Sequence, residues 1–559
     1  MYFGIDLGTT NSLISVFENG RPRVLGGSQP LFPSVVSVMD GTLVLGAPAR
    51  ERLVSHPEHT AAAFKRAMGT KKAFRLGWKQ YDAQELSALI LRALRQRALE
   101  ETGVAPQDVV VSVPAYFNQI QRNATRAAAI AAGLNPIRLV NEPTAAAIAY
   151  GLQDIAAEGH TLVVDLGGGT FDVSIVEVFE KVIEVKASSG DAFLGGEDFT
   201  RALFNRLAQE FDLAPKTDAE RALLWNAAEV LKLGLTRAQE ASCPLPWRDG
   251  ARALSITREA FTDASASLIQ RLRLPIERAI HDAGLSRDEI DRVVLVGGAT
   301  RMPLVRTLVA RLTGKLPESG LDPDQVVALG AATQAALIAR DAGCDDVVMT
   351  DVSAFSLGFE VARRVGDRIE QGYFEPVIER NTTIPVSREF VFQTTQKGQR
   401  EILFELFQGE APLVRDNIAL GKLLVAVPRN RADYEIVIAR LSYDSSGLIE
   451  IDTKVASTGA TRSIVITDLT GGLSERELDA RRKTLAALKV HPREGAENVA
   501  LSARLERCFA MALGEDRVTI QDMLALFRQA LERQHLSEIA ALREQIGQTL
   551  DQFEAGYVR

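Results

Sequence analysis

The chain has 559 residues, with 64 Lys and Arg against 72 Asp and Glu, so its formal net charge is −8. Hydrophobic residues make up 46% and charged residues 24%, which is typical of a folded globular protein and excludes a disordered or collagen-like chain. The acidic balance, without a basic block, argues against nucleic acid or an anionic membrane as the main partner. The length suggests three or four structural units.

The cysteines and the hydropathy pattern indicate a reducing compartment. Cys243, Cys344 and Cys508 lie far apart without a CxxC pair, which fits neither a disulfide framework nor a zinc site. The first residues have no basic start, and no window approaches 18 unbroken apolar residues. We therefore predict a cytoplasmic protein without a membrane span.

The first 340 residues alternate short apolar strands with helices, as in a layered α/β domain. Several predicted helices end at a glycine, which suits a left-handed C-cap: Gly133, Gly151 and Gly284. The predicted strands are 3–6, 12–17, 108–113, 161–166, 173–178 and 291–296. The predicted helices are 118–132, 142–150, 219–231, 258–283, 302–312 and 324–339.

The pattern changes after residue 352. From there to about residue 470, short alternating runs and turn signals predict an antiparallel β-sandwich. Helical periodicity returns at Ser474 and continues to the last residue. The chain thus reads as α/β, then β, then α.

One motif occurs twice in the α/β part. Residues 5–10 read IDLGTT, and residues 164–170 read VDLGGGT, so Asp6 and Asp165 occupy equivalent positions. Each copy is an apolar strand that ends in Asp-Leu-Gly and a hydroxyl-bearing turn. Glycine turns let backbone N–H groups converge on an anion, and carboxylates approach phosphate only through a cation such as Mg²⁺. The sequence therefore predicts two facing turns around a phosphate and magnesium site, whereas a single copy would fit a plain hairpin equally well.

Six blocks make the chain resemble the seventy-kilodalton heat-shock (DnaK) family of chaperones, and within it the HscC-type bacterial branch. They are DLGTTNS at 6–12, VPAYFN at 113–118, NEPTAAAIAYGL at 141–152, DLGGGTFDVS at 165–174, LGGEDF at 194–199 and VGGATRMP at 296–303. NTTIP at 381–385, LFQGE at 406–410 and SYDSSGLIEI at 442–451 continue the resemblance into the β region. It is collinear from Asp6 to about Gly472.

The resemblance implies an ATP-dependent chaperone with four parts. They are an actin-like (ribonuclease H-like), two-lobed ATPase domain at 1–345, a linker at 346–351, a β-sandwich peptide-binding domain at 352–472 and a shortened helical lid at 473–559. The expected cofactors are ATP or ADP, Mg²⁺ and K⁺. The expected activity is hydrolysis of ATP to ADP and phosphate, which controls capture and release of apolar client segments.

The resemblance also assigns site residues. It implies a catalytic set of Asp6, Lys65, Glu142, Asp165, Thr170 and Asp172, in which the four carboxylates also serve as metal ligands. The implied nucleotide contacts are Gly8, Thr9, Thr10, Asn11, Gly167, Gly168, Gly169, Thr170, Gly195, Gly196, Glu229, Lys232, Gly297, Gly298, Arg301 and Asp324. Without the resemblance, Glu229 and Lys232 would fit equally well as a surface ion pair on one helix face.

Further residues are implied in communication and peptide binding. Pro114, Arg122 and Asp351 match positions that relay nucleotide state, and the linker would dock on the ATPase domain, although it could also be a buried first strand of the β domain. The implied peptide-binding positions are Phe359, Val361, Ala362, Phe392, Thr395, Ile402 and Phe404, each of which could equally be a core residue.

The expected partners are non-native clients and a J-domain cochaperone, for which Arg138 matches a contact. Short segments after Gly69 and at 241–257 leave a GrpE-type exchange factor open. We expect a monomer that binds neither nucleic acid nor membrane. Two other functions compete with this one: a regulator of one or few folded partners, and a sugar kinase on the same ATPase fold, which does not account for the β region.

Overall fold

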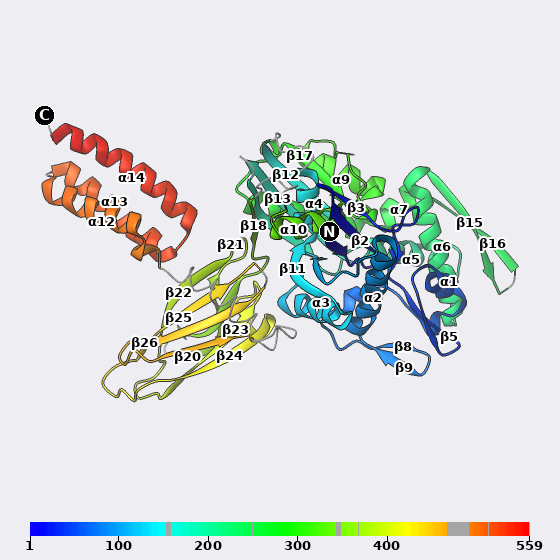
Figure 1. Cartoon of the computed structure of the whole chain (residues 1–559), viewed down its shortest axis with the longest axis horizontal. Helices are drawn as coiled ribbons and strands as arrows, with labels where there is room; N and C mark the ends of the chain where they lie inside the picture. The colour runs from blue at the N-terminus through cyan, green and yellow to red at the C-terminus, as the bar shows by residue number, and fades with distance from the viewer. Residues whose placement is uncertain are drawn as a thin grey trace.

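The structure is a computed structural model in which three differently built regions follow one another along the chain. Blue to green α/β elements, yellow strands and orange to red helices succeed each other across the molecule (Figure 1). The described residues are 1–151, 158–179, 182–248, 250–318, 320–341, 348–366, 368–445, 447–466, 491–512 and 514–557.

The first sheet of the α/β region is built around a hairpin. Strand β1 is antiparallel to β2 and parallel to β10, and the order is β11-β10-β1-β2-β3, with β4 on β2. Its central strands are buried along most of their length, as expected for a sheet covered on both faces. The bounds are β1 (Tyr2–Asp6), β2 (Asn11–Glu18), β3 (Arg21–Val24), β4 (Phe32–Pro33), β10 (Asp108–Val113) and β11 (Asn135–Asn141).

The second sheet repeats this plan. Strand β12 is antiparallel to β13 and parallel to β17, and the order is β17-β12-β13-β14-β18-β21. Asp165 therefore lies near the end of the first hairpin strand, as Asp6 does in the first sheet. The bounds are β12 (Gly159–Leu166), β13 (Phe171–Phe179), β14 (Val182–Asp191), β17 (Arg292–Val296), β18 (Val348–Val352) and β21 (Thr383–Ile384).

Two helices join the sheets. α10 (Val326–Ile338) lies on β1 and β2 and packs against α4 (Glu142–Gly151), which lies on β12 and β13. α10 has ten buried residues, so it is apolar all round, as expected of a helix enclosed in a core. The outer helices are α1 (Ala47–Ser55), α2 (Ala83–Thr102), α3 (Gln119–Ala131), α5 (Gly196–Glu210), α6 (Asp218–Arg237), α7 (Arg258–Ala264), α8 (Ala266–Asp282) and α9 (Pro303–Thr313).

Small hairpins and single turns complete the α/β region. The short strands are β5 (Val36–Met39), β6 (Thr42–Leu45), β7 (Thr60–Ala61), β8 (Phe74–Leu76), β9 (Lys79–Tyr81), β15 (Glu240–Trp247) and β16 (Gly250–Thr257). The 3₁₀ turns, including two outside this region, are η1 (Pro57–His59), η2 (Phe64–Ala67), η3 (Arg287–Glu289), η4 (Gly298–Arg301), η5 (Val414–Asp416) and η6 (Pro492–Glu494).

The β region consists of two antiparallel sheets packed on one apolar core. Their orders are β20-β19-β23-β24 and β22-β25-β26-β27. The predicted alternation is thus confirmed as a sandwich. The bounds are β19 (Leu357–Val365), β20 (Arg368–Ile378), β22 (Val386–Gln393), β23 (Glu401–Gln408), β24 (Ile418–Ala426), β25 (Ile436–Tyr443), β26 (Ile449–Val455) and β27 (Thr461–Val465).

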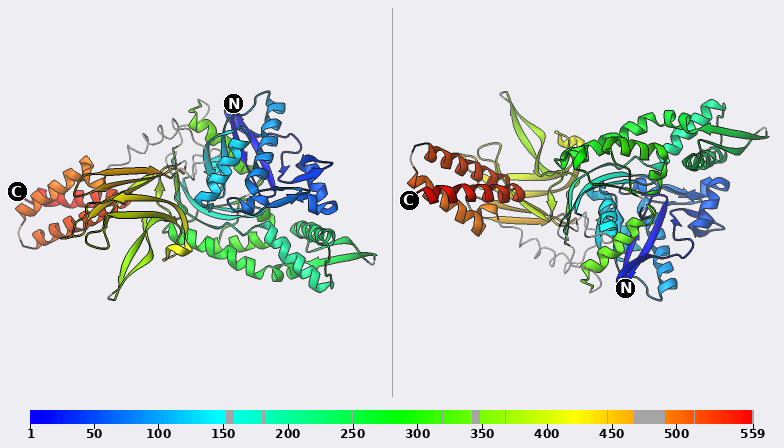
Figure 2. Two further views of the ribbon diagram at one scale, coloured as in Figure 1. Left: turned by 90° about the horizontal axis from the view of Figure 1, so that it is seen from below. Right: turned by 90° about the horizontal axis from the view of Figure 1, so that it is seen from above.

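In the described residues from 491 onward, three helices share a separate core: α12 (Ala496–Met511), α13 (Gly514–Arg533) and α14 (Leu536–Tyr557). The turn between α13 and α14 contacts β22, where Gln534 Nε2 donates to Glu389 O at 2.8 Å and Arg388 Nη1 donates to Arg533 O at 3.1 Å. Figure 2 shows the bundle beside the yellow strands in both views. The part of the predicted lid from 473 to 490 lies outside the described residues.

No helix in the described parts of the chain combines the length and the apolar character needed to cross a lipid bilayer.

Most predicted elements are confirmed within a few residues, with one clear exception. The predicted helix 258–283 is two helices, because Ser265 leaves the helical conformation between α7 and α8 (φ −97°, ψ 3°). Ser265 is fully buried and its N–H donates to Phe261 O and Thr262 O. Apolar periodicity continues through this point, so the pattern alone could not reveal the break.

The predicted linker is a strand in the second sheet. β18 pairs in parallel with β14 through Val182↔Val348 to Glu184↔Thr350, and Asp351 then pairs with Ile384 of β21. The segment therefore extends a sheet of the α/β region, while residues 346 and 347 lie outside the described residues. Pairing with β14 supplies hydrogen bonds that an exposed connector would have to find in water.

Close packing of α4 against α10 gives a stability prediction. A Cβ at Gly330 would overlap Ala145 O of α4, so Gly330→Ala must separate the two helices that hold the sheets together. Overpacking of this kind costs about 1–3 kcal/mol. We expect a lower thermal midpoint for Gly330→Ala, measured by circular dichroism on the full chain.

Gly547→Ala in α14 is the matched control, because a Cβ there meets no atom within 4 Å. It should leave the midpoint unchanged or raise it slightly, since alanine is the better helix former. Equal midpoints for the two variants would contradict the packing argument.

Candidate functional site

The two glycine turns lie against each other. A Cβ at Gly168 would overlap Thr10 Oγ1, and a Cβ at Gly169 would lie 2.8 Å from Thr9 Oγ1. Thr9 and Thr170 are buried, and both hydroxyl-bearing turns follow the equivalent strands β1 and β12. Only glycine lets the two backbones approach this closely. The structure thus brings together the turns that the repeated motif placed 159 residues apart.

The second turn also holds the start of α5. Gly196 N donates to Gly167 O and Glu197 N donates to Gly168 O, both at 2.9 Å, while Gly195 N donates to Asp198 Oδ2. The first turn is held by Ser34, whose Oγ donates to Gly8 O at 2.8 Å. The turn from Gly8 to Asn11 and the turn from Gly167 to Thr170 are therefore fixed by hydrogen bonds outside themselves.

Four carboxyl groups and one ammonium group gather beside these turns. Lys65, from η2, donates to Glu142 Oε1 at 2.7 Å, and the two residues are 3% and 6% exposed. Asp165 and Asp172 stand directly opposite each other in the β12–β13 hairpin. Asp6 accepts from Ser112 Oγ at 2.7 Å. One cation thus faces four acids, so the group holds excess negative charge when all of them are ionised.

The pKa values respond to this crowding. Burial first, and then Glu142, raises the pKa of Asp172 to about 8, and the same two causes raise the pKa of Asp6 to about 6. Burial, Glu142 and Asp172 raise the pKa of Asp165 well above its usual range. Perturbed carboxyl groups that meet in one place are typical of functional sites.

The acid cluster fits a bound cation through water better than direct ligation. Asp172 Oδ2 is buried without a hydrogen-bond partner, although Oδ1 accepts from Tyr116 N at 2.8 Å. Among the described residues, no three His, Cys, Asp or Glu side chains are placed to bind a metal directly. Mg²⁺ keeps several of its waters in protein sites, so carboxylates can hold it by hydrogen bonds to those waters instead of binding the ion directly.

The remaining predicted nucleotide contacts form two polar groups. Lys232 Nζ donates to Glu229 Oε2 at 2.7 Å and to Gly196 O at 3.1 Å, which ties α6 to the start of α5. Arg301 Nη2 donates to Asp322 at 2.6 Å and Asp324 at 2.7 Å. A Cβ at Gly297 would lie 2.9 Å from Asp165 Oδ1, and one at Gly298 would lie 2.9 Å from Asp324 Oδ1, so η4 begins close to the acid cluster.

Sequence reasoning missed three partners of this site. Ser112 and the backbone of Tyr116 supply hydrogen bonds to Asp6 and Asp172. Arg66, next to Lys65, donates to Phe193 O at 2.8 Å and to Asp198 at 3.2 Å, and so links the first sheet's side to α5. Ser112 directly precedes the VPAYFN motif and Tyr116 lies in it, so this motif is the signal in the sequence that could have indicated both.

Two of the predicted relay residues, Arg122 and Asp351, meet through Asn141 at the end of the α/β region, while Pro114 lies in the loop before α3. Arg122 donates to Asn141 Oδ1 at 2.5 Å, and Asn141 Nδ2 donates to both Asp351 oxygens at 2.9 and 2.8 Å. Pro114 O accepts from Phe117 N at 3.1 Å in the same loop. Asn141 directly precedes Glu142, so this junction adjoins the Lys65 ion pair. A small cavity of about 20 Å³ lies here, lined in part by Arg122, Asn141 and Asp351.

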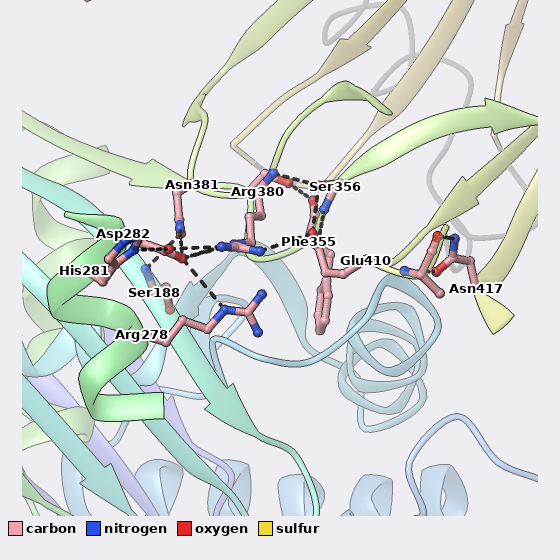
Figure 3. Close-up of polar contacts among 12 residues, drawn as sticks. Ser188, Arg278, His281, Asp282, Phe355, Ser356, Arg380, Asn381, Glu410 and Asn417 are labelled. Carbon is pink, nitrogen blue, oxygen red and sulfur yellow. Dashed lines mark hydrogen bonds and ion pairs between the residues drawn. The ribbon is translucent and has the colours of Figure 1, made fainter. Parts of the chain in front are cut away.

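A second group of contacts joins the α/β and β regions. Arg380 donates through Nε and Nη2 to the two oxygens of Asp282, each at 3.0 Å, and Asn381 Nδ2 donates to the same carboxylate at 3.0 Å (Figure 3). Asn381 Oδ1 accepts from Ser188 N at 3.0 Å. Burial alone would raise the pKa of Asp282, but hydrogen bonds from Arg380 hold it below its usual value. Asp282 at the end of α8 is therefore held as an anion.

The predicted peptide-binding residues lie at different depths in the sandwich. Phe359 and Phe404 are 0% and 2% exposed, and their rings lie 5.6 Å apart and 5.5 and 5.3 Å from the ring of Phe392. Phe359 and Phe404 therefore belong to the core between the sheets. Phe392 and Ile402 are half-buried against that core. The remaining positions are half-buried or exposed: Val361, Ala362 and Thr395.

Comparisons with known proteins cover nearly the whole chain. The family profile described as "Hsp70 protein" matches residues 2–75 and 72–555. "Chaperone protein DnaK" of Thermotoga petrophila is 37% identical over 571 residues, which is 96% of this chain and 94% of the relative. Proteins of the same name from Thermotoga neapolitana and Thermosipho africanus are 40% and 39% identical; each match covers 83% of this chain, with 80% and 79% of the relatives.

The raised carboxyl pKa values predict a pH-dependent stability. The folded-state pKa of Asp172, about 8, exceeds its unfolded value, so between these values the folded chain binds more protons than the unfolded chain. Stability must then fall as the pH rises. Without nucleotide or divalent metal, we expect the thermal midpoint to fall as the pH rises from about 4 to about 8, and to fall less in Asp172→Asn.

Asp288→Asn is the control, because that side chain is 89% exposed and lies outside the cluster. Its curve should follow that of the natural chain. Parallel curves for Asp172→Asn and the natural chain would show that Asp172 ionises as it does in water.

Proposed function

The chain belongs to the Hsp70 family, and we propose that it is an ATP-driven chaperone whose nucleotide site is the acid cluster between the two glycine turns. Chaperones of this family are ATPases, and the matched relatives include the β region and the helices. The observation that supports this site best is the close approach of two equivalent turns, from Thr9 and from Gly168, beside buried carboxylates and Lys65. A sugar kinase would leave the β region without a role.

We assign phosphate binding to the two turns. Backbone N–H groups and hydroxyls of Thr9, Thr10 and Asn11 would hold phosphate oxygens from one side, and those of Gly168 to Thr170 from the other. Bound Mg²⁺ would neutralise phosphate charge, and Asp6, Glu142, Asp165 and Asp172 are its proposed holders through water. The buried, unpartnered Asp172 Oδ2 supports a further K⁺ shared with Asp6.

We propose that Lys65 and the carboxylates act on the attacking water. Phosphoryl transfer depends on positioning and charge neutralisation more than on covalent chemistry. Lys65 is held by Glu142 and buried, so its ammonium group has a fixed position from which it can orient a water and neutralise phosphate charge. Asp165 and Thr170 would hold that water and accept its proton at an oxygen.

The nucleoside is assigned to the polar groups around α5 and η4. Gly195 and Gly297 allow close packing of backbone here, since a Cβ at either would overlap the DLGGGT strand and turn at Leu166 to Gly169. The side chains of Glu229, Lys232, Arg301 and Asp324 add hydrogen-bonding groups near Gly196 and Gly298. Lys232 and Arg301 are each held by carboxylates, so they are positioned before a ligand arrives. Positioning of this kind lowers the entropy cost of binding.

We propose the predicted division of the chain: an actin-like ATPase domain of two lobes at 1–345, a linker at 346–351, a peptide-binding sandwich at 352–472 and a lid at 473–559. The parallel plan of the two sheets, each around an Asp-Leu-Gly hairpin, supports two lobes. The separate apolar cores of the sandwich and of the C-terminal helices support units with different tasks.

Communication between site and sandwich would pass through the Asn141–Glu142 junction. Glu142 holds Lys65, and Asn141 holds Arg122 and the linker residue Asp351. A shift of this junction on hydrolysis would alter both contacts at once. Pro114, whose loop also carries Arg122 contacts at Ala115 O and Phe117 O, is the second proposed relay point.

Client segments are proposed to bind at Phe392, Ile402, Val361, Ala362 and Thr395, with Phe359 and Phe404 beneath them. We further propose a monomer in the bacterial cytoplasm that works with a J-domain cochaperone at Arg138. The match of Arg138 to the family's J-domain contact supports this proposal; in the structure burial lowers the pKa of Arg138, and the charge of Asp351 offsets only part of that lowering.

Asp165→Asn tests the nucleotide site. The change removes one charge from a crowded group, so the nucleotide-free thermal midpoint should stay the same or rise. Loss of a carboxylate that acts on the reacting groups should lower single-turnover ATP hydrolysis about 10²-fold. Asp288→Asn should change neither quantity, and parental hydrolysis by Asp165→Asn would place the chemistry elsewhere.

Arg380→Gln and Asp282→Asn test the coupling between regions. Each breaks a charge-assisted pair worth about 1.5–3 kcal/mol, so stimulation of the ATPase by an apolar peptide should fall roughly tenfold. The double variant should be no worse than either single one, because both remove the same contact.

Arg206→Gln is the control for this cycle, since Arg206 pairs with Glu210 on the surface of α5. It should keep full stimulation. Additive losses in the double variant would mean that the two residues act separately.

A further inference from the structure

The β19–β20 hairpin continues beyond the sandwich as a two-stranded arm. β19 pairs with β23 only from Leu357 to Phe359, but with β20 as far as Val365↔Arg368. Both views in Figure 2 show this hairpin, in yellow-green, extending away from the other strands of the sandwich. The outer half of the hairpin is therefore supported by its own pairing and faces water on both sides.

Two more loops lie at the same end of the sandwich. Because β19 and β23 are antiparallel, the arm leaves the sheet toward Glu401, where β23 begins. The loop before Glu401 is joined to the loop before β25: Gly398 N donates to Asn430 O at 2.5 Å, and Lys397 Nζ donates to Ala432 O at 2.6 Å. Three connections of the sandwich thus share one end.

This end is basic in an otherwise acidic chain. Segments 363–370, 396–401 and 428–434 contain seven Arg and Lys but four Asp and Glu, whereas the whole chain has a net charge of −8. The exposed cations are Arg364, Arg368, Lys397, Arg400, Arg429 and Arg431. Arg363 is paired with Glu375 at 2.8 Å, but in the described part of the chain Arg364, Arg429 and Arg431 have no acidic partner.

Exposed apolar side chains lie between these cations. From the buried Phe359, rings continue through Phe392 to Phe390, with centroid distances of 5.5 and 5.2 Å, and Phe390 is 37% exposed. Val391 and Ile436, on the other face of the same sheet, are 60% and 45% exposed. The rings lead from the sandwich core to the surface of β22, and Phe392 is the ring nearer the basic loop that follows this strand.

We infer that this end of the sandwich selects extended client segments with an apolar centre and acidic flanking residues. The inference rests on the proposed chaperone function and specifies its substrate class. Apolar residues of the client would cover Phe390 and Phe392, while carboxylates on either side would meet the free arginines of the arm and of the 428–434 loop. Segments with basic flanks would meet like charges, so charge selects between clients of equal hydrophobicity.

Single-stranded nucleic acid is the rival ligand for exposed rings with cations. The aliphatic Val365 and Ile369 of the arm, 47% and 52% exposed, offer no stacking surface for bases. They suit the apolar side chains of a peptide instead, so the composition of the surface favours the peptide.

The test compares three fluorescein-labelled peptides that share one Ala-Leu-Ile-Leu-Ala core and carry Asp, Asn or Lys pairs on both sides. Binding to the full chain with ADP is followed by fluorescence anisotropy. The Asp-flanked peptide should bind about tenfold more tightly than the Asn-flanked one at about 0.05 M salt, and the Lys-flanked peptide more weakly than both. The difference should largely vanish at about 0.5 M salt, because exposed charges are screened.

The double charge reversal Arg429→Glu with Arg431→Glu should invert the order of the Asp- and Lys-flanked peptides and leave the Asn-flanked peptide unchanged. The matched control is Arg92→Glu with Arg287→Glu, two exposed arginines of the α/β region, which should keep the original order. Persistence of the original order in the first pair would overturn the assignment to this end.

The outcomes separate the two claims. Equal binding of all three peptides, or preference for the Lys-flanked one, overturns the charge selection and leaves the chaperone function standing. Failure of every peptide to bind overturns the proposed peptide-binding function and this inference with it. Displacement of the Asp-flanked peptide by a single-stranded oligouridylate at a similar concentration would assign the surface to nucleic acid instead.

Discussion

The burial of four carboxyl groups around a single lysine is the constraint on which the structure of the α/β region depends. Burying acids is costly, and the cost rises when they face one another, as Asp165 and Asp172 do across their hairpin. Lys65 and the N–H and O–H donors of Tyr116 and Ser112 offset part of this burial cost. The part of the cost that is not offset raises the pKa values of these acids, and for the same reason a cationic ligand would stabilise the site. Without a cationic ligand, the folded chain would be more stable if these acids were replaced by neutral residues.

The same elements that bury the acids also reach the β region. Tyr116 donates its N–H to Asp172 while its ring packs on Phe355 at a centroid distance of 4.4 Å. Asn141 and Glu142 are neighbours in sequence, and they contact Asp351 and Lys65 respectively. Two short connections therefore link the proposed phosphate site with the sandwich. Because few rotatable bonds lie between them, a small movement of the site would be transmitted to the sandwich.

The contacts between the regions are mainly polar, in contrast to the apolar cores within each region. Asp282, Arg380, Asn381 and Ser188 are joined by hydrogen bonds, and Gln119 N donates to Gln408 Oε1 at 2.9 Å. Polar groups can exchange a protein partner for water at modest net cost, whereas separated apolar cores cannot. An interface of this kind suits regions that must part and rejoin during a cycle.

Sequence patterns determined the local structure and much of the candidate site. Apolar periodicity defined the strands of both hairpins to within a few residues, and the repeated Asp-Leu-Gly motif indicated that Asp6 and Asp165 occupy equivalent places. What the patterns could not show are contacts between distant residues that have no periodicity of their own. Ser112 beneath Asp6, the Arg380–Asp282 pair and the break at Ser265 are of this kind, and so is the depth of Phe359 and Phe404 within the sandwich. Local periodicity reports which side of an element is apolar; only tertiary packing decides which other element covers that side.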